Sequence, residues 1–292
     1  MVGHLLHVGY PKTGTKFLSE WFGAHPQLAY RLGSLAGYSD VYEVVRDGVA
    51  PRPGVLYRVT SFEGLTAPRR DPRGVIVSYD DSVDPTRAQE NICTSLAMLF
   101  PNAHVLIVTR GFRAMILSSF SQYVRSGGDA TLEQLIARSP LADPWDYDRV
   151  VGMYRRAFGD HKVIVMPYEL LRDDADRFLR TIEDCLGLTH FSVPPDRVNA
   201  SLSPIEMYWY PRVTRTLCRL PIGARLKRLY LHGVFVNRFR RAIALLQRVR
   251  PGTPVTADAI PDHVVAAYRG KARSLRDEPC YAPYARDYFQ SD

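Results

Sequence analysis

A short segment near the N-terminus has the residue types that bind phosphate. It reads Gly9-Tyr10-Pro11-Lys12-Thr13-Gly14-Thr15-Lys16-Phe17 and follows the apolar run Leu5–Val8. The stretch that begins inside it, Thr15–Gly23, has helical spacing. A glycine loop between a strand and a helix points backbone N–H groups and the helix N-terminus at an anion. The segment therefore predicts an anion-binding loop, and a plain glycine turn between strand and helix is the alternative.

The spacing of Gly9 and Gly14 matches the ATP-binding pattern GxxxxGK[ST], but the residues after Gly14 do not. In that pattern the lysine reaches the β- and γ-phosphates, and the hydroxyl that follows holds magnesium. Here Thr15-Lys16 stands in place of Lys-Ser/Thr, so Lys16 occupies the position of the metal-binding hydroxyl. The lysine best placed for chemistry is then Lys12, inside the loop.

A second cation follows the apolar run Val105–Thr109. This cation is Arg110, and Ser118 follows eight residues later on a predicted helix. Ligands of open α/β sheets bind at the carboxyl ends of the strands, which is where Arg110 is expected. The planar guanidinium suits a terminal phosphate because it donates two parallel hydrogen bonds. Taken alone, Arg110 is equally well explained as a surface charge.

The sequence PKTGT, followed by a large apolar residue and leucine, resembles the 5′-phosphosulfate loop of sulfotransferases that use PAPS (3′-phosphoadenosine 5′-phosphosulfate). The resemblance implies that Lys12 protonates or stabilises the bridging oxygen of the leaving group. It places Thr13, Gly14, Thr15, Lys16 and Phe17 around the 5′-phosphate. The family commonly has a second threonine where this chain has Lys16, so the contact of that hydroxyl is lost.

Arg110 and Ser118 resemble the motif that binds the 3′-phosphate in the same family, although the usual Asn-Pro after the arginine is absent. Tyr168, after Val163–Pro167, resembles a tyrosine that lies near the adenosine, and an ordinary tyrosine at a strand-to-helix turn explains it almost as well. Ser201 lies in a segment that resembles a loop closing over the nucleotide. The resemblance covers roughly residues 4 to 203, and it implies PAPS as donor, PAP (adenosine 3′,5′-bisphosphate) as product and no metal ion.

Transfer to a hydroxyl requires a general base, which a His, Glu or Asp within hydrogen-bond reach can supply. Two adjacent acids, Asp80 and Asp81, follow the apolar run Val75–Tyr79, and one of such a pair can have a raised pKa. We predict Asp81 as the base, with Asp40, Glu43 and His25 as alternatives. Acids at a strand end also cap the next helix, which is the competing explanation for Asp81.

Strand-like and helix-like runs alternate through the first two thirds of the chain. Strands are predicted at Leu5–Val8, Val55–Thr60, Val75–Tyr79, His104–Thr109 and Lys162–Met166. Helices are predicted at Thr15–Gly23, Pro85–Phe100, Phe112–Arg125, Pro144–Phe158 and Asp173–Leu186. This alternation predicts a three-layer, P-loop-like α/β fold with a mostly parallel sheet flanked by helices. We expect one domain over residues 1–292, with a helical C-terminal extension from about residue 204.

Composition limits the cellular setting. Hydrophobic residues make up 46% of the chain and charged residues 23%, as in globular proteins. The four cysteines are scattered, so neither a disulfide framework nor a zinc site is expected. No apolar run approaches the roughly 20 residues of a membrane-spanning helix. We therefore expect a cytoplasmic protein whose net charge of +8 favours anionic partners.

The acceptor is not identified by the sequence: a carbohydrate, a lipid-linked sugar or a natural product all fit, and no nucleic acid is expected. The stretch Tyr208–Arg250 mixes aromatic residues, leucines and basic residues. It could cover the acceptor, bind an acidic acceptor, lie against the inner face of a membrane, or form a solvated basic surface. The oligomeric state is not indicated. A P-loop kinase with Asp80 or Asp81 as magnesium ligand, and a non-catalytic module that binds membranes or polyanions, are the competing functions.

Overall fold

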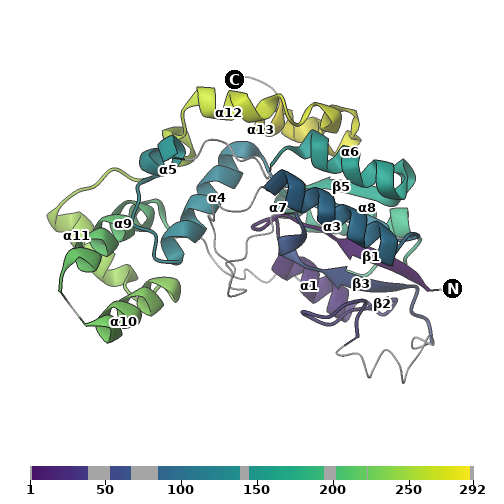
Figure 1. The fold of residues 1–292 in the computed structure, drawn as a ribbon, viewed down its shortest axis with the longest axis horizontal. Helices are drawn as coiled ribbons and strands as arrows, with labels where there is room; N and C mark the ends of the chain where they lie inside the picture. Colours follow the sequence, from purple (N-terminus) through teal and green to yellow (C-terminus); the bar gives the residue numbers. More distant parts are fainter. Residues whose placement is uncertain are drawn as a thin grey trace. The chain divides into compact units, whose positions relative to one another are not determined.

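The computed structural model describes residues 2–38, 53–66, 85–138, 145–193, 202–221 and 223–289 (Figure 1). The chain divides into two compact units. The first consists of Met1–Gly111, Asp143–Val198 and Ala266–Asp292, and the second of Phe112–Ala142 and Asn199–Val265. The single domain with an extension from about residue 204 stays a prediction.

The first unit is built on a parallel sheet. Its strands are β1 (Gly3–His7), β2 (Leu28–Ala29), β3 (Tyr57–Ser61), β4 (His104–Thr109) and β5 (Val163–Pro167). They lie in the order β2-β3-β1-β4-β5, and every neighbouring pair is parallel. In the central strand, Leu6 pairs with Thr60 on one side and Val105 on the other. The carboxyl ends of β1 and β4 therefore meet at one edge of the sheet, which confirms the predicted α/β class.

Helices cover both faces of this sheet (Figure 1). The first face carries α1 (Thr15–Ala24), α7 (Tyr168–Asp173) and α8 (Ala175–Leu186), and the other carries α3 (Pro85–Leu99) and α6 (Tyr147–Phe158). Leu106 and Val108 of β4 join Trp21 of α1 and Phe178 of α8 in one buried cluster. On the opposite face α6 packs against β4 and β5, and α3 packs against α6. Because both faces are buried, Val105–Val108 of β4 and Val163–Pro167 of β5 are continuously apolar, which is the pattern that predicted these two strands.

The main difference from the predicted elements lies after β5. The predicted helix Asp173–Leu186 corresponds to α8, whereas the short helix α7 before it was not predicted, and Asp174 separates the two. The side chain of Asp174 accepts a hydrogen bond from the backbone N–H of Arg177 and so begins α8 as an N-cap. The predicted stop is confirmed, since Gly187 ends α8 with φ 66°. The predicted strand Val75–Tyr79 lies outside the described residues.

The described part of the second unit is helical and contains no strand. Its helices are α4 (Phe112–Arg125), α5 (Leu132–Arg138), α9 (Pro204–Arg219), α10 (Ala224–Phe235) and α11 (Arg240–Val249). Ser203 and Glu206 form a reciprocal capping box that begins α9. α9 packs against α4, α10 and α11 and is therefore the central helix of this unit.

Among the described residues, no helix is both long and apolar enough to cross a bilayer.

The last described segment belongs again to the first unit. After α12 (Asp262–Arg269) it contains the short helices η4 (Arg273–Asp277), η5 (Pro279–Tyr284) and α13 (Ala285–Tyr288). Within it, η5 packs against β5, and Tyr281 and Tyr288 are completely buried. These two tyrosines reach the end of β4, where Arg110 lies.

Candidate functional site

The loop between β1 and α1 has the backbone of an anion-binding loop. Gly14 has φ 84° and directly precedes α1. Lys12 has φ 69°, in the left-handed region that costs a residue other than glycine about 1–2 kcal/mol. Thr13 is buried and its hydroxyl donates to the carbonyl oxygen of Tyr10 at 2.5 Å. Such strain is typical of functional loops whose surroundings fix the backbone.

The beginning of α1 leaves polar groups available for an anion. No side chain caps this helix, and its first turn contains no acidic residue. The hydroxyl of Thr15 is buried and has no hydrogen-bond partner among the described residues. Lys16, one residue further, is exposed. Uncapped N–H groups together with an orphaned hydroxyl fit a bound phosphate, which would accept from both.

Gly9, the first glycine of the loop, is explained by a buried histidine. A side chain at this position would overlap the ring of His7, the last residue of β1. Nδ1 of that ring lies 2.7 Å from the hydroxyl of Ser61 at the end of β3. Burial lowers the pKa of His7 to about 3, so the ring is neutral at physiological pH. His7 therefore fixes the exit of β1 as a packing residue.

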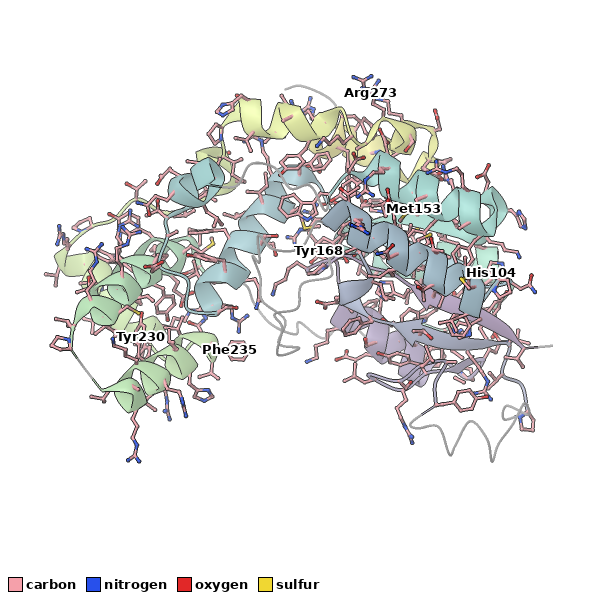
Figure 2. The ribbon with its side chains drawn as sticks, in the orientation of Figure 1. His104, Met153, Tyr168, Tyr230, Phe235 and Arg273 are labelled. Atoms are coloured by element: carbon pink, nitrogen blue, oxygen red, sulfur yellow. The ribbon has the colours of Figure 1, made fainter. Side chains whose placement is uncertain are left out.

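Arg110 directly contacts the loop. Its Nη1 donates to the carbonyl oxygen of Lys12 at 2.8 Å, and its guanidinium carbon lies 4.6 Å from the centre of the Tyr168 ring. Tyr168, labelled in Figure 2, begins α7. Nε of Arg110 is buried without a hydrogen-bond partner among the described residues. The structure thus brings together three predicted site residues, Lys12, Arg110 and Tyr168, from three separate segments.

Two buried side chains hold the backbone around Arg110. The hydroxyl of Tyr147, at the beginning of α6, donates to the carbonyl oxygen of Arg110 at 2.7 Å. Oε1 of Glu169 accepts from the backbone N–H of Gly111 at 3.0 Å. Together these contacts fix the turn that follows β4 on both sides of the arginine. We conclude that the direction of the Arg110 side chain is set by its backbone as well as by Lys12.

A chain of hydroxyls extends this support into the C-terminal segment. Tyr288 donates to Oε2 of Glu169 at 2.7 Å, and Thr109 donates to the hydroxyl of Tyr288 at 3.2 Å. The hydroxyl of Tyr281 lies 2.7 Å from that of Thr109. Burial raises the pKa of Glu169, while the hydrogen bonds from Tyr288 and Gly111 lower it in part. These supporting residues were missed by the sequence analysis, and only Glu169, next to Tyr168, has a local signal.

Several predicted site residues stay predictions. Asp81 and Ser201, like the alternatives Asp40 and Glu43, lie outside the described residues. Ser118 lies on α4 in the second unit, where its buried hydroxyl has no partner among the described residues.

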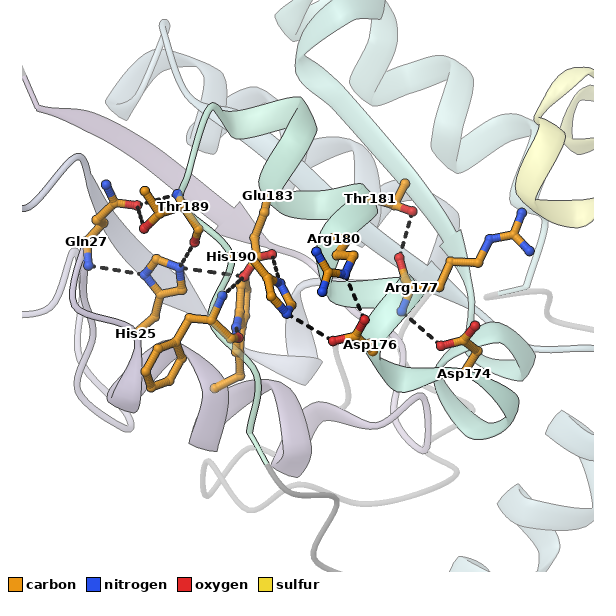
Figure 3. Close-up of polar contacts among 12 residues, drawn as sticks. His25, Gln27, Asp174, Asp176, Arg177, Arg180, Thr181, Glu183, Thr189 and His190 are labelled. Carbon is orange, nitrogen blue, oxygen red and sulfur yellow. Dashed lines mark hydrogen bonds and ion pairs between the residues drawn. The ribbon is translucent and has the colours of Figure 1, made fainter.

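His25 is placed as part of a structural network rather than as a base (Figure 3). Its Nδ1 accepts from the backbone N–H of Gln27 at 3.1 Å, and its Nε2 lies 3.2 Å from the carbonyl oxygen of Thr189. Glu183 lies beside it at 3.7 Å and accepts a hydrogen bond from the backbone N–H of Phe191. Because both ring nitrogens already make hydrogen bonds, His25 has no free lone pair that could remove the proton of a substrate hydroxyl.

Within the described ranges no group of three or more His, Cys, Asp or Glu side chains could hold a metal ion. What the described site offers is an array of anion-binding groups: the uncapped end of α1, the Thr15 hydroxyl, Lys12 and the Arg110 guanidinium.

Comparisons with known proteins give distant structural similarities. No known protein-family profile matches the sequence, and no curated protein matches it. The chain is similar to the crystal structure of a sulfotransferase from Alicyclobacillus acidocaldarius, with 18% identity, a TM-score of 0.47, and coverage of 80% of this chain and 96% of that one. It is also similar to mouse sulfotransferase SULT7A1 complexed with PAP, with 15% identity, a TM-score of 0.35, and coverage of 65% and 60%. Both TM-scores are below 0.5, so neither similarity identifies the donor or acceptor of this chain.

Proposed function

We propose that this protein is a sulfotransferase that moves a sulfuryl group from PAPS to a hydroxyl acceptor. The observation that carries the proposal is the 2.8 Å hydrogen bond from Arg110 to the carbonyl oxygen of Lys12. It joins the loop predicted to bind the 5′-phosphosulfate to the arginine predicted to bind the 3′-phosphate. PAPS has a phosphate at each of these positions, so two cationic groups held in one site match its charge distribution.

Lys12 is proposed to act on the leaving group. Negative charge accumulates on the bridging oxygen between phosphate and sulfate as the S–O bond breaks. A cation fixed at that oxygen stabilises the transition state more than the bound donor, which lowers the barrier rather than only tightening binding. The fixed left-handed backbone of Lys12 supports this role because it limits where the ammonium can lie.

The test compares Lys12→Ala with Lys16→Ala. Lys12→Ala should raise the barrier by about 2.7–4 kcal/mol, the contribution of one preorganised donor, and so lower kcat by about 10²–10³-fold. Lys16 is exposed and offers general attraction, so its loss should mainly raise the KM for the donor. Turnover and PAP affinity of both variants distinguish the roles. An unchanged kcat in Lys12→Ala would leave only an anion-binding loop.

The remaining roles complete the proposal. Ser118 and Ser201 are proposed as further donor ligands, and Asp81 as the general base. Asp81→Asn should lower kcat by roughly 10²–10⁴-fold without weakening PAP binding, and near-normal turnover would exclude Asp81.

The proposal needs no metal ion, so a chelator should leave turnover unchanged. ATP that binds only with magnesium would instead favour a kinase.

The acceptor is proposed to be a small hydroxyl compound, either a carbohydrate, a lipid-linked sugar or a natural product. A cytoplasmic location stays a prediction from the scattered cysteines. A structure with PAP bound would show the size and polarity of the space beside the sulfate position, and so the acceptor class.

A further inference from the structure

One segment of the second unit carries the positive charge of the whole chain. Residues 219–250 contain nine lysines and arginines and no aspartate or glutamate. Since the complete chain has a net charge of +8, the other 260 residues together carry −1. We call residues 219–250 the basic segment; within the described residues it consists of the end of α9, α10, α11 and the residues that connect them.

The basic segment also exposes large apolar side chains. Seven lie in this stretch, with 44–84% of their surface exposed: Leu220, Leu226, Leu229, Phe235, Val236, Leu245 and Val249. Phe235, at the end of α10, is labelled in Figure 2. Isolated exposed leucines are ordinary on protein surfaces, but such a concentration in one short stretch marks an interaction surface.

On α10 the exposed leucines and arginines alternate along neighbouring rows. Leu226 and Leu229 are three residues apart, as are Arg225 and Arg228, and all four are exposed. The buried side of the helix is formed around Val234, which is completely inaccessible. Residues three apart lie on one face of a helix, so apolar side chains and guanidinium groups point outward together.

α11 repeats this arrangement on the same supporting helix, since both α10 and α11 pack against α9. Leu245 and Val249, four residues apart, are 61% and 84% exposed. Arg241 and Arg248 are exposed beside them, while Ile243 is buried. α11 therefore adds a second exposed row that contains both apolar and basic side chains.

Most cations of this surface have no acidic partner. Arg240 lies 3.7 Å from Glu206, and Lys227 donates to the carbonyl oxygen of Cys218. Among the described residues no carboxylate pairs with Arg225, Arg228, Arg241 or Arg248. Their charge is therefore available to an external anionic partner.

We propose that the basic segment is a docking surface for an anionic lipid bilayer. The bilayer interface accommodates both components, because phosphate headgroups pair with the arginines while the leucines reach the acyl boundary. A nucleic acid or an acidic glycan would neutralise the arginines but leave the leucines and valines in water. Two copies of the chain that met through this surface would bring nine cations against nine, so self-association is disfavoured.

The test is sedimentation with phosphatidylcholine vesicles, with and without phosphatidylglycerol. The wild-type protein should bind only the vesicles that contain phosphatidylglycerol, and added salt should weaken binding. The charge variant Arg225→Ser/Arg228→Ser/Arg241→Ser should reduce the partition coefficient on the order of 100-fold, from roughly 1 kcal/mol per basic residue. The apolar variant Leu226→Ser/Leu229→Ser/Leu245→Ser should also lose binding, although its charge is intact.

The matched control removes three exposed cations of the first unit, as Arg87→Ser/Arg177→Ser/Arg273→Ser, and should bind vesicles like the wild type. PAP affinity and circular dichroism verify that every variant is folded. Equal binding to neutral vesicles would overturn the proposal, and so would equal losses in the control. Full vesicle binding by the apolar variant would overturn the proposed insertion of the leucines, and binding to heparin without binding to vesicles would instead identify a soluble polyanion as the partner.

Discussion

Arg110 has two contacts in the structure that belong to different tasks. Its Nη1 holds the carbonyl oxygen of Lys12, and its guanidinium lies over the ring of Tyr168. The proposed phosphate contact must therefore use the remaining N–H groups, of which Nε is buried without a partner among the described residues. A guanidinium has five N–H donors in a fixed fork, so it can hold the loop and the phosphate together.

Arg110→Ala should therefore weaken PAP binding by about 1.5–3 kcal/mol, the range for hydrogen bonds to a charged group. The loss should be much smaller for a nucleotide without the 3′-phosphate, such as adenosine 5′-monophosphate. Calorimetric titration of both nucleotides measures the difference. Equal losses would mean that the arginine only supports the loop, and its role in binding the 3′-phosphate would be withdrawn.

Two histidines, the partly buried His4 and the fully buried His7, are expected to make the fold sensitive to acid. Burial, with a smaller effect of Arg58, lowers the pKa of His4 to about 4, and burial lowers that of His7 to about 3. An unfolded histidine titrates near pH 6.5, so below this pH the unfolded chain binds protons that the folded chain excludes. Their contribution to stability is complete above about pH 6.5 and decreases as the pH falls toward the folded pKa values.

The melting temperature should accordingly decrease from neutral pH to about pH 4, and His4→Gln should make this decrease shallower. Glutamine can keep the hydrogen bond that His4 makes with the hydroxyl of Thr60 at 2.9 Å. His161→Gln, at an exposed position, is the control. Thermal unfolding followed by circular dichroism across this range measures the effect. An unchanged slope in His4→Gln would show that other groups determine the acid sensitivity.

At the scale of elements, the uncapped beginning of α1, where we propose that the phosphate binds, depends on one glycine. Gly14 has φ 84°, and a side chain there would also overlap Leu171 of α7. The Leu171 side chain can move aside, but the backbone of α1 cannot begin without the left-handed residue. Glycine adopts this conformation without the penalty of other residues. A substitution of Gly14 is therefore expected to reduce both the stability of the protein and the binding of an anion by the loop.

Gly14→Ala should destabilise the protein by about 1–2 kcal/mol and weaken PAP binding, because the strain falls on the loop itself. Gly23→Ala, in the same helix, is the control. A methyl group there meets only Tyr30 at 3.8 Å, so the substitution should stabilise by about 0.5–1 kcal/mol. Urea unfolding and PAP titration of both variants test the prediction. It would be wrong if the two substitutions had the same effect on stability.

The elements differ in how far the sequence predicts them. β4 and α4 have the predicted bounds, because a run of buried residues and a clear helical period leave one interpretation. β2 has only two residues, too few for any period to show. α7 was not predicted, because its six residues are too few to show a helical period.

The residues of the site also differ in how far the sequence predicts their positions. The sequence places Lys12 and Arg110 at one edge of the sheet, since both follow strands of a parallel sheet. The hydrogen bond between them, across 98 residues of sequence, needs coordinates. The support from Tyr288 to Glu169 spans 119 residues and has no local pattern at all. Asp81 and Ser201 stay predictions, because they lie outside the described residues.

At the scale of the whole molecule, the C-terminal segment is expected to matter for a site formed near the N-terminus. Tyr288→Phe removes the donor to the buried carboxylate of Glu169 and should cost about 1–3 kcal/mol of stability. It should also raise the KM for the donor, because Gly111 and Arg110 lose part of their support. Tyr284→Phe is the control in the same segment, since Tyr284 is only partly buried. Urea unfolding and donor kinetics measure both effects; a Tyr288→Phe protein with wild-type stability and KM would contradict the prediction.

The return of the C-terminal segment also sets an order of events during synthesis. All the strands that the structure describes have been translated once Pro167 is made, yet the turn that holds Arg110 is incomplete at that stage. Tyr288 is made 179 residues after Thr109, which corresponds to about 10–40 s at a ribosomal rate of 5–20 residues per second. During this interval the nascent sheet has its glycine loop but lacks the hydroxyl chain behind Arg110. The proposed donor site is therefore complete only after Tyr288 is made, and a ribosome that stalls before Tyr281 leaves the turn around Arg110 without this support.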